Sequence, residues 1–221
     1  MFEPISTFLQ VVALVMAALL PLINPPGAAP IFLQLTPGMS EAERGHVASR
    51  IARDAFMLLA AATLVGSYVL LMFGLSLPVI RIAGGLLVVA TAWRLIGAEE
   101  DSDKPIVPRP SGGADVTSGW TFYPLTFPLT VGPGSLSVAV TLGAGIRQNT
   151  AVNVAAIAGA FAGIFMVTVM VYLAYRFASR LVRVLGPNGT VVLLRLSSFI
   201  LLAIGVQILC DGLAERFAIG G

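Results

Sequence analysis

PLINPPGAAP, residues 21–30, places four prolines, an asparagine and a glycine inside one of the most apolar stretches of the chain. Proline removes a backbone donor and glycine loosens the backbone, so a helix is expected to break here. In lipid such a break is tolerated only where the freed groups meet protein, water or a solute. A single break is equally typical of a proline kink that only bends a helix.

The composition around this stretch is that of a membrane protein. Hydrophobic residues make up 57% of the chain and charged residues 11%, and the mean hydropathy is +0.93. This leaves too little polar surface for a water-soluble globule of 221 residues. The net charge of +2 is small and dispersed, which argues against nucleic acid. The single cysteine, Cys210, and the single histidine exclude an internal disulfide and argue against a zinc or redox site.

Apolar stretches of about 20 residues, the length that crosses a bilayer, occur at six places. They lack the strict alternation of membrane barrel strands, so they predict helices and an all-α polytopic membrane protein. The acidic start MFEP and the continuation past Asn24 favour a retained helix over a cleaved signal. The predicted spans are residues 12–35, 55–73, 78–96, 120–143, 152–175 and 191–213.

The segments between these spans differ strongly in charge. Basic residues gather on one side, which marks the cytoplasmic side and places both termini on the periplasmic side. The longest polar segment, residues 98–119, is predicted to be a cytoplasmic linker between the units 1–97 and 120–221. The basic residues on the predicted cytoplasmic side are Arg44, Arg50, Arg53, Lys104, Arg109, Arg176, Arg180 and Arg183.

A second stretch, PLTVGPGS at residues 128–135, matches PLINPPGA. Both lie in the first helix of a set of three, and the third helices also match, with Arg81 aligned to Arg195. Because three is odd, the second set enters the membrane from the opposite face, as in many secondary transporters. We therefore predict two inverted three-helix repeats, each with its first helix broken near mid-membrane. The alternative is chance similarity between segments rich in Pro, Gly and Leu, but chance would have to produce two matches in the same order along the chain.

Each break is expected to expose backbone groups that can bind a small solute. Half-helices beginning at Gly27 and Gly134 are predicted to present free amides and a positive dipole end to a carboxylate. Gly27, Gly132 and Gly134 are each expected to permit the unusual backbone dihedrals of an unwound turn. Free carbonyls near Leu22 and Leu129 suit an ammonium group or a coupling cation. For each hydroxyl near the second break, backbone capping is the simpler role. The predicted substrate-binding residues are Asn24, Pro25, Gly27, Ala28, Thr130, Gly132, Pro133, Gly134 and Ser135.

Three ionisable residues are predicted to gate the pathway or to couple it to an ion: Arg81, Arg195 and Asp211. The two arginines are expected to begin their helices, where reaching the membrane interface is the simpler interpretation. Asp211 is expected either to carry a coupling proton or to be a solvated acid near the outer interface.

Four motifs in order carry a family resemblance: NPPGAAPIFLQLT, IRIAGGLLV, FPLTVGPGS and LLRLSSFILLAIGVQILCDGL. With them the sequence resembles the MarC family of prokaryotic inner-membrane proteins over the whole chain except residues 98–118. The resemblance implies six transmembrane helices, an inner-membrane location and transport of small neutral amino acids, alongside a link to multiple antibiotic resistance. It supplies no catalytic residues to transfer, and Pro26 stands at a position that varies in the family.

Together these observations predict a secondary transporter of a small zwitterion such as glycine or alanine, coupled to a proton or a sodium ion and without a cofactor or metal. A channel for small polar solutes is the main alternative, although Val131 stands where a paired Asn-Pro motif needs asparagine. A membrane scaffold is another. No nucleophile, base or metal cluster at a membrane edge points to an enzyme. The expected partners are the substrate and the lipid bilayer, and a homo-oligomer is compatible with the sequence.

Overall fold

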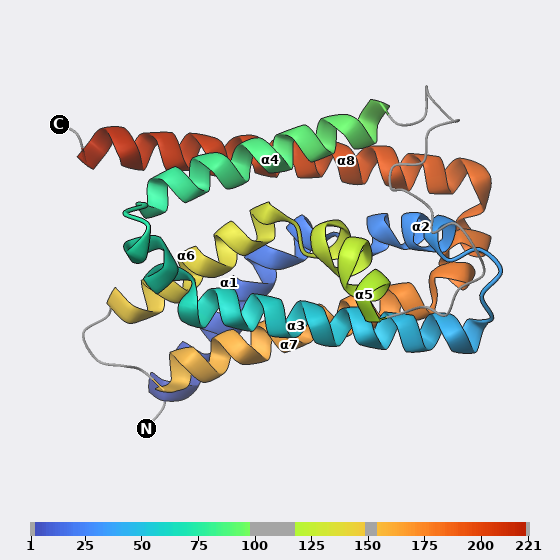
Figure 1. Cartoon of the computed structure of the whole chain (residues 1–221), viewed down its shortest axis with the longest axis horizontal. Coiled ribbons are helices and arrows are strands. Elements are labelled where there is room, and N and C mark those ends of the chain that lie inside the picture. The colour runs from blue at the N-terminus through green and yellow to red at the C-terminus, as the bar shows by residue number, and fades with distance from the viewer. Residues whose placement is uncertain (1–2, 98–117, 149–153, 220–221) are drawn as a thin grey trace.

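The computed structural model describes residues 3–97, 118–148 and 154–219, and these residues form helices joined by short turns. The long helices run along one common axis, and α1 begins at the end of the bundle where α8 ends (Figure 1). We call this end the terminal end. The opposite end, where α3 begins and α7 ends, carries Arg44, Arg50, Arg53, Arg176 and Arg180 and is called the basic end.

The helices follow the predicted order of apolar stretches. Five of them are long and apolar enough to cross a membrane, and a bent pair, η1 and α6, makes a sixth span if counted as one. The all-helical class is confirmed for the described residues, whereas most of the predicted linker 98–119 lies outside them. The elements are α1 (Glu3–Ile23), α2 (Pro25–Leu35), α3 (Glu41–Met72), α4 (Leu77–Gly97), α5 (Ser118–Trp120), η1 (Thr121–Thr130), α6 (Pro133–Gln148), α7 (Val154–Arg176) and α8 (Ala178–Ile219).

Two charged segments that lie between the predicted spans are helical. Residues 41–54 belong to α3, because Ser40 and Glu43 form a capping box in which each side chain bonds the other's backbone amide. The basic residues after Arg176 begin α8 at Ala178, and only Gly186, at φ 65°, interrupts that helix. Hydropathy misses both segments because they are polar. The first continues into the membrane part of α3, whereas the second forms a separate helical segment before the kink at Gly186, where ψ is −179°.

The two predicted breaks differ in shape. At the first, Asn24 alone leaves the helix, with φ 46° and ψ 60°, and residues 4–35 still form one apolar span. Pro25 and Pro26 then occupy the first helical positions of α2, where a proline costs no hydrogen bond. At the second, Val131 and Gly132 separate η1 from α6, and the two axes meet at 72°.

The outer faces of the bundle are apolar, as lipid contact requires. Large side chains such as Leu71, Trp93 and Phe199 are well exposed, and on a soluble protein such a surface would be an interaction site or an aggregation hazard. The buried core lies between α1, α2, α3, α6 and α7 and includes Phe32 and Leu59. The exposed apolar belt therefore agrees with the spans assigned from hydropathy.

Candidate functional site

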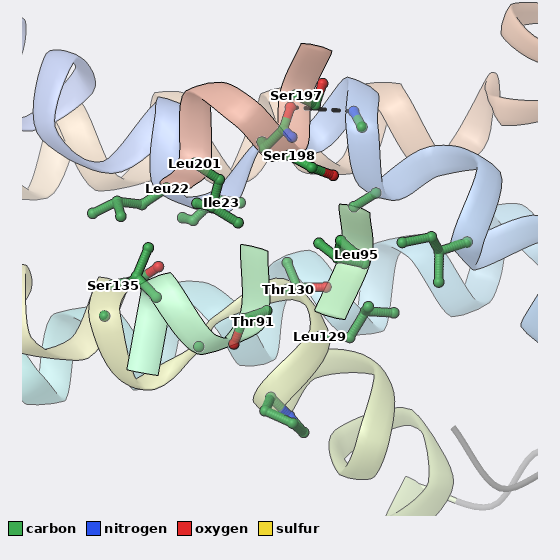
Figure 2. Close-up of a pocket in the computed structure, with 18 of the residues that line it drawn as sticks. Leu22, Ile23, Thr91, Leu95, Leu129, Thr130, Ser135, Ser197, Ser198 and Leu201 are labelled. Atoms are coloured by element: carbon green, nitrogen blue, oxygen red, sulfur yellow. Dashed lines mark hydrogen bonds between the residues drawn. The ribbon is translucent and has the colours of Figure 1, made fainter. Parts of the chain in front are cut away.

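A cavity of about 220 Å³ lies between the two helix breaks. Its volume suits a small solute better than a drug-sized ligand, whose pockets measure roughly 300 to 1,000 Å³. Figure 2 shows Leu22, Ile23 and Leu201 on one wall and Ser135, Thr130 and Leu129 on the facing wall. The two stretches that matched in sequence therefore border one space.

The structure brings eight of the nine predicted substrate-binding residues to this cavity: Asn24, Gly27, Ala28, Thr130, Gly132, Pro133, Gly134 and Ser135. The ninth, Pro25, lines a separate cavity of about 500 Å³ between α1, α7 and α8. Asn24 borders both cavities. The first break therefore separates two cavities, and Pro25 borders the one that the second break does not reach.

The N-terminus of α2 is closed by its own residues, contrary to the prediction that it offers free amides. Pro25 and Pro26 have no N–H, Gly27 N donates to Asn24 Oδ1 at 3.2 Å, and Ala28 N donates to Asn24 O at 3.0 Å. Asn24 also adopts the left-handed backbone that the sequence assigned to glycine. Gly27 is required for space instead, because a Cβ there would lie 2.3 Å from Asn24 Nδ2.

The N-terminus of α6 remains open. Pro133 has no N–H, and the amides of Gly134 and Ser135 are among the first-turn donors that a helix cannot satisfy internally. Ser135 is 3% exposed, borders the cavity, and its hydroxyl has no hydrogen-bond partner among the described residues. Free donors and a positive helix end therefore meet at this wall of the cavity, which is an arrangement that binds anions.

Gly134 is needed for close helix packing and not for an unusual dihedral. A Cβ at Gly134 would lie 2.0 Å from Val88 Cγ2 of α4. Neither Gly132 nor Gly134 has a left-handed φ, so the expectation of glycine-specific dihedrals in the second break is wrong. The second break is made by Pro124, Pro128 and Pro133 within a short segment.

Tyr175 of α7 connects the two broken helices on the outer side of the cavity wall. Its hydroxyl lies 2.9 Å from Thr130 Oγ1, which also donates to Leu125 O at 2.7 Å. Its ring stacks on Phe32 of α2 with centroids 4.6 Å apart and an interplanar angle of 5°. Tyr175 is fully buried, so these contacts fix the second break relative to α2.

Several polar cavity residues come from α4 and α8 and were missed in the sequence. Thr91 and Arg94 belong to α4, and Ser197 and Ser198 belong to α8. Ser198 Oγ donates to Leu194 O at 2.7 Å, whereas Ser197 has no hydrogen-bond partner in the described part of the chain. The α4 lining residues (87, 88, 91, 94 and 95) are spaced so that they fall along one side of a helix, which the sequence alone can predict. The spacing does not show whether that side borders lipid or a cavity.

The cavity extends from the breaks toward the basic end and stops on the other side. Its α4 residues lie in the C-terminal half of that helix, and its α8 residues lie in the half of the straight part of α8, residues 187–219, that is nearer the basic end (Figure 1). Toward the terminal end, α4 packs closely on its neighbours, since a Cβ at Gly84 would lie 2.6 Å from Ser137 Cβ and one at Gly85 would lie 2.7 Å from Leu209 N. Ser137 Oγ also donates to Ile80 O at 3.0 Å.

The three predicted gating residues lie outside the cavity lining. Arg81, near the start of α4, pairs with Glu215 near the end of α8. Arg195 lies inside the part of α8 that follows the Gly186 kink, and not at the start of either helical part. Asp211 is exposed and accepts a hydrogen bond from Gln207 Nε2 at 2.7 Å. The described residues also contain no group of His, Cys, Asp and Glu side chains placed to hold a metal ion.

Apolar spans arranged around an internal cavity define this molecule as a multi-pass integral membrane protein of the helical type. The chain belongs to the MarC family: the model of the MarC family integral membrane proteins matches residues 9–217.

Curated relatives support the same assignment. The inner membrane protein MarC of Escherichia coli K12 is 29% identical over 210 residues, which cover 93% of this chain and 95% of the relative. The MarC protein of Shigella flexneri matches with the same identity and coverage. The names of these relatives and the apolar helices fit a multi-pass inner-membrane location. No solved structure matches the chain significantly.

Proposed function

We propose that the protein is a secondary transporter of small zwitterions such as glycine and alanine, driven by a proton or sodium gradient, with its binding site at the two helix breaks. The observation that carries this proposal is the shared cavity, to which both breaks contribute backbone and side-chain groups. Broken helices whose ends face one central site are typical of secondary transporters.

The packing of the helices supports an inverted repeat. Exchanging the repeats maps α1 and α2 onto η1 and α6, α3 onto α7, and α4 onto α8. Under this exchange the contacts of α2 with α8 match those of α6 with α4, and the contacts of α1 and α2 with α7 match those of η1 and α6 with α3. The pairs α3–α7 and α4–α8 map onto themselves. A two-fold relation between the two halves produces this pattern, and because α3 begins at the basic end, where α7 ends, the proposed axis lies in the membrane plane (Figure 1).

The one-sided shape of the cavity favours a carrier over a channel. The space reaches from the breaks toward the basic end, while Gly84, Gly85 and Ser137 pack tightly on the other side. A channel needs a continuous path through the bilayer, whereas a carrier is open to one side at a time. By the excess of arginine, the basic end faces the cytoplasm and both termini face the periplasm.

Uptake into proteoliposomes tests this proposal. Purified protein should accumulate labelled alanine saturably under an imposed proton or sodium gradient. Ser135→Ala should raise the KM for alanine about fivefold, because it removes one hydrogen-bonding group from the cavity wall. Thr141→Val is the matched control on the same helix, since Thr141 bonds only its own helix through Ser137 O and does not border the cavity.

Three results would contradict the proposal. Alanine and glycine uptake equal to that of protein-free vesicles under both gradients would exclude this transport activity. Equal KM values for Ser135→Ala and Thr141→Val would place the substrate elsewhere in the protein. Solute movement that does not saturate would indicate a channel.

A further inference from the structure

We propose that Arg94 is the residue that selects the substrate, by binding its carboxylate, and that the cavity therefore accepts small carboxylates whether or not they carry an ammonium group. This inference rests on the proposed function and names the chemistry of the same site. It assigns the selectivity to a charge on α4 that lies outside both broken helices.

Arg94 is the one charged side chain that lines the cavity within the described residues. Its guanidinium has no ion-pair or hydrogen-bond partner in that part of the chain, unlike Arg44, which bonds Thr36 and Ser179, or Arg81, which pairs with Glu215. A guanidinium offers five donors in a planar fork that matches a carboxylate. A free arginine at the wall of a small cavity is therefore available to a ligand anion.

Arg94 lies on α4 between the second break and the basic end. Val88 contacts Gly134 at the start of α6, and Arg94 lies about 9 Å further along the axis of α4, where both residues line the cavity. Helical side chains lean toward the N-terminus of their helix, which from Arg94 is the direction of Val88. The long side chain can thus act on the same anion as the free amides of Gly134 and Ser135.

No acidic side chain among the described residues gives the cavity a charged partner for a cation, so an ammonium group would meet only neutral acceptors, such as the backbone carbonyls near Leu22 and Leu129. Its lining contains no aspartate or glutamate among the described residues, and its other polar side chains are Asn24, Thr91, Thr130, Ser135, Ser197 and Ser198. Thr130 is held by Tyr175 and Leu125, and Thr91 donates to Leu87 O. The open end of α6 and Arg94 both favour negative charge, so the site recognises the carboxylate strongly and the ammonium group weakly.

Direct binding to the full-length protein in nanodiscs separates this inference from transport. Three probes of similar size are compared: L-alanine, L-lactate, which has a hydroxyl in place of the ammonium group, and ethylamine, which lacks the carboxylate. Isothermal titration should give alanine and lactate dissociation constants within about tenfold of one another and no binding of ethylamine. Arg94→Gln should weaken both carboxylates about ten- to a hundredfold, and Arg94→Lys should weaken them less because it keeps the charge.

Arg50→Gln is the matched control, because Arg50 is an exposed arginine of the basic end that does not border the cavity. It should leave all three affinities unchanged. Ethylamine binding as tightly as lactate, unchanged carboxylate affinity in Arg94→Gln, or no carboxylate binding by the wild-type protein would each overturn the inference. Carboxylate binding that depends on Arg94, together with no uptake in proteoliposomes, would uphold the inference and reject the transporter.

Discussion

Gly132 and Gly134 lie two residues apart in the second break, yet a methyl group at each would meet different surroundings. At Gly132 the nearest atom is Pro128 O at 3.5 Å, an ordinary contact, whereas at Gly134 Val88 Cγ2 lies only 2.0 Å away. The sequence predicts the same role for both, as substrate-binding glycines of one break. The structure shows that only the second is a point of close contact between α4 and α6.

We expect Gly134→Ala to destabilise the protein by about 1 to 3 kcal/mol, since it forces α4 away from α6. Gly132→Ala should be nearly neutral, and adding Val88→Ala to Gly134→Ala should recover part of the loss by removing the colliding methyl group. Unfolding in mixed micelles measures the three differences. Equal effects of the two alanines, or no recovery in the double variant, would contradict this account of Gly134.

At the scale of the element, α2 is a short helix held at both of its ends. Asn24 closes its N-terminus. At its C-terminus Arg44 Nη2 donates to Thr36 O at 3.2 Å and Arg44 Nε donates to Thr36 Oγ1 at 3.3 Å, while Nη1 reaches Ser179 Oγ of α8 at 3.2 Å. Arg44 therefore fastens α2 to the first turns of α3 and α8 at the basic end.

We expect Arg44→Gln to cost about 1 to 3 kcal/mol, because the carbonyl of the fully buried Thr36 loses its charged donor. The release should also increase hydrogen exchange of amides in α2, measured by mass spectrometry on the protein in nanodiscs. Arg50→Gln, on the same helix but exposed, provides the baseline. Identical exchange of α2 in the two variants would show that Arg44 does not hold this helix.

At the scale of the whole molecule, the proposed inverted repeat predicts two states, and the structure would be one of them. Ile31 of α2 borders the cavity, whereas its repeat mate Val138 of α6 does not. If the repeats exchange conformations during transport, the cavity closes around Ile31 and opens around Val138. The close packing of Gly84 on Ser137 is then the contact that separates.

Cysteine labelling tests this exchange in a Cys210→Ala background, which removes the exposed native thiol. In the state described here, a membrane-impermeant maleimide added from the cytoplasmic side should label Ile31→Cys much faster than Val138→Cys. Alanine supplied with its driving gradient should slow the first reaction and allow labelling of Val138→Cys from the periplasmic side. Labelling of both positions from one side at all times would contradict alternating access.

Local composition determined much of the architecture. The apolar lengths predicted the membrane spans, and the prolines at 25, 26 and 133 predicted where two helices break, because hydropathy and a missing backbone donor act within a few residues. The match between PLINPPGA and PLTVGPGS led to eight residues that line one cavity. The polar first turns of α3 were missed, since a helix continues past the bilayer wherever its backbone bonds continue, and the polar helical segment of α8 before the Gly186 kink was missed because hydropathy detects only apolar spans.

Only the tertiary structure decided how the site is completed. Whether the amide of Gly27 in α2 is free depends on the rotamer of Asn24, and whether residue 134 must be a glycine depends on Val88 of another helix. Arg94 and Ser197 join the cavity because α4 and α8 pack beside the breaks. Such neighbours are distant in sequence, and their approach is set by the packing of the entire bundle, so no local pattern encodes it.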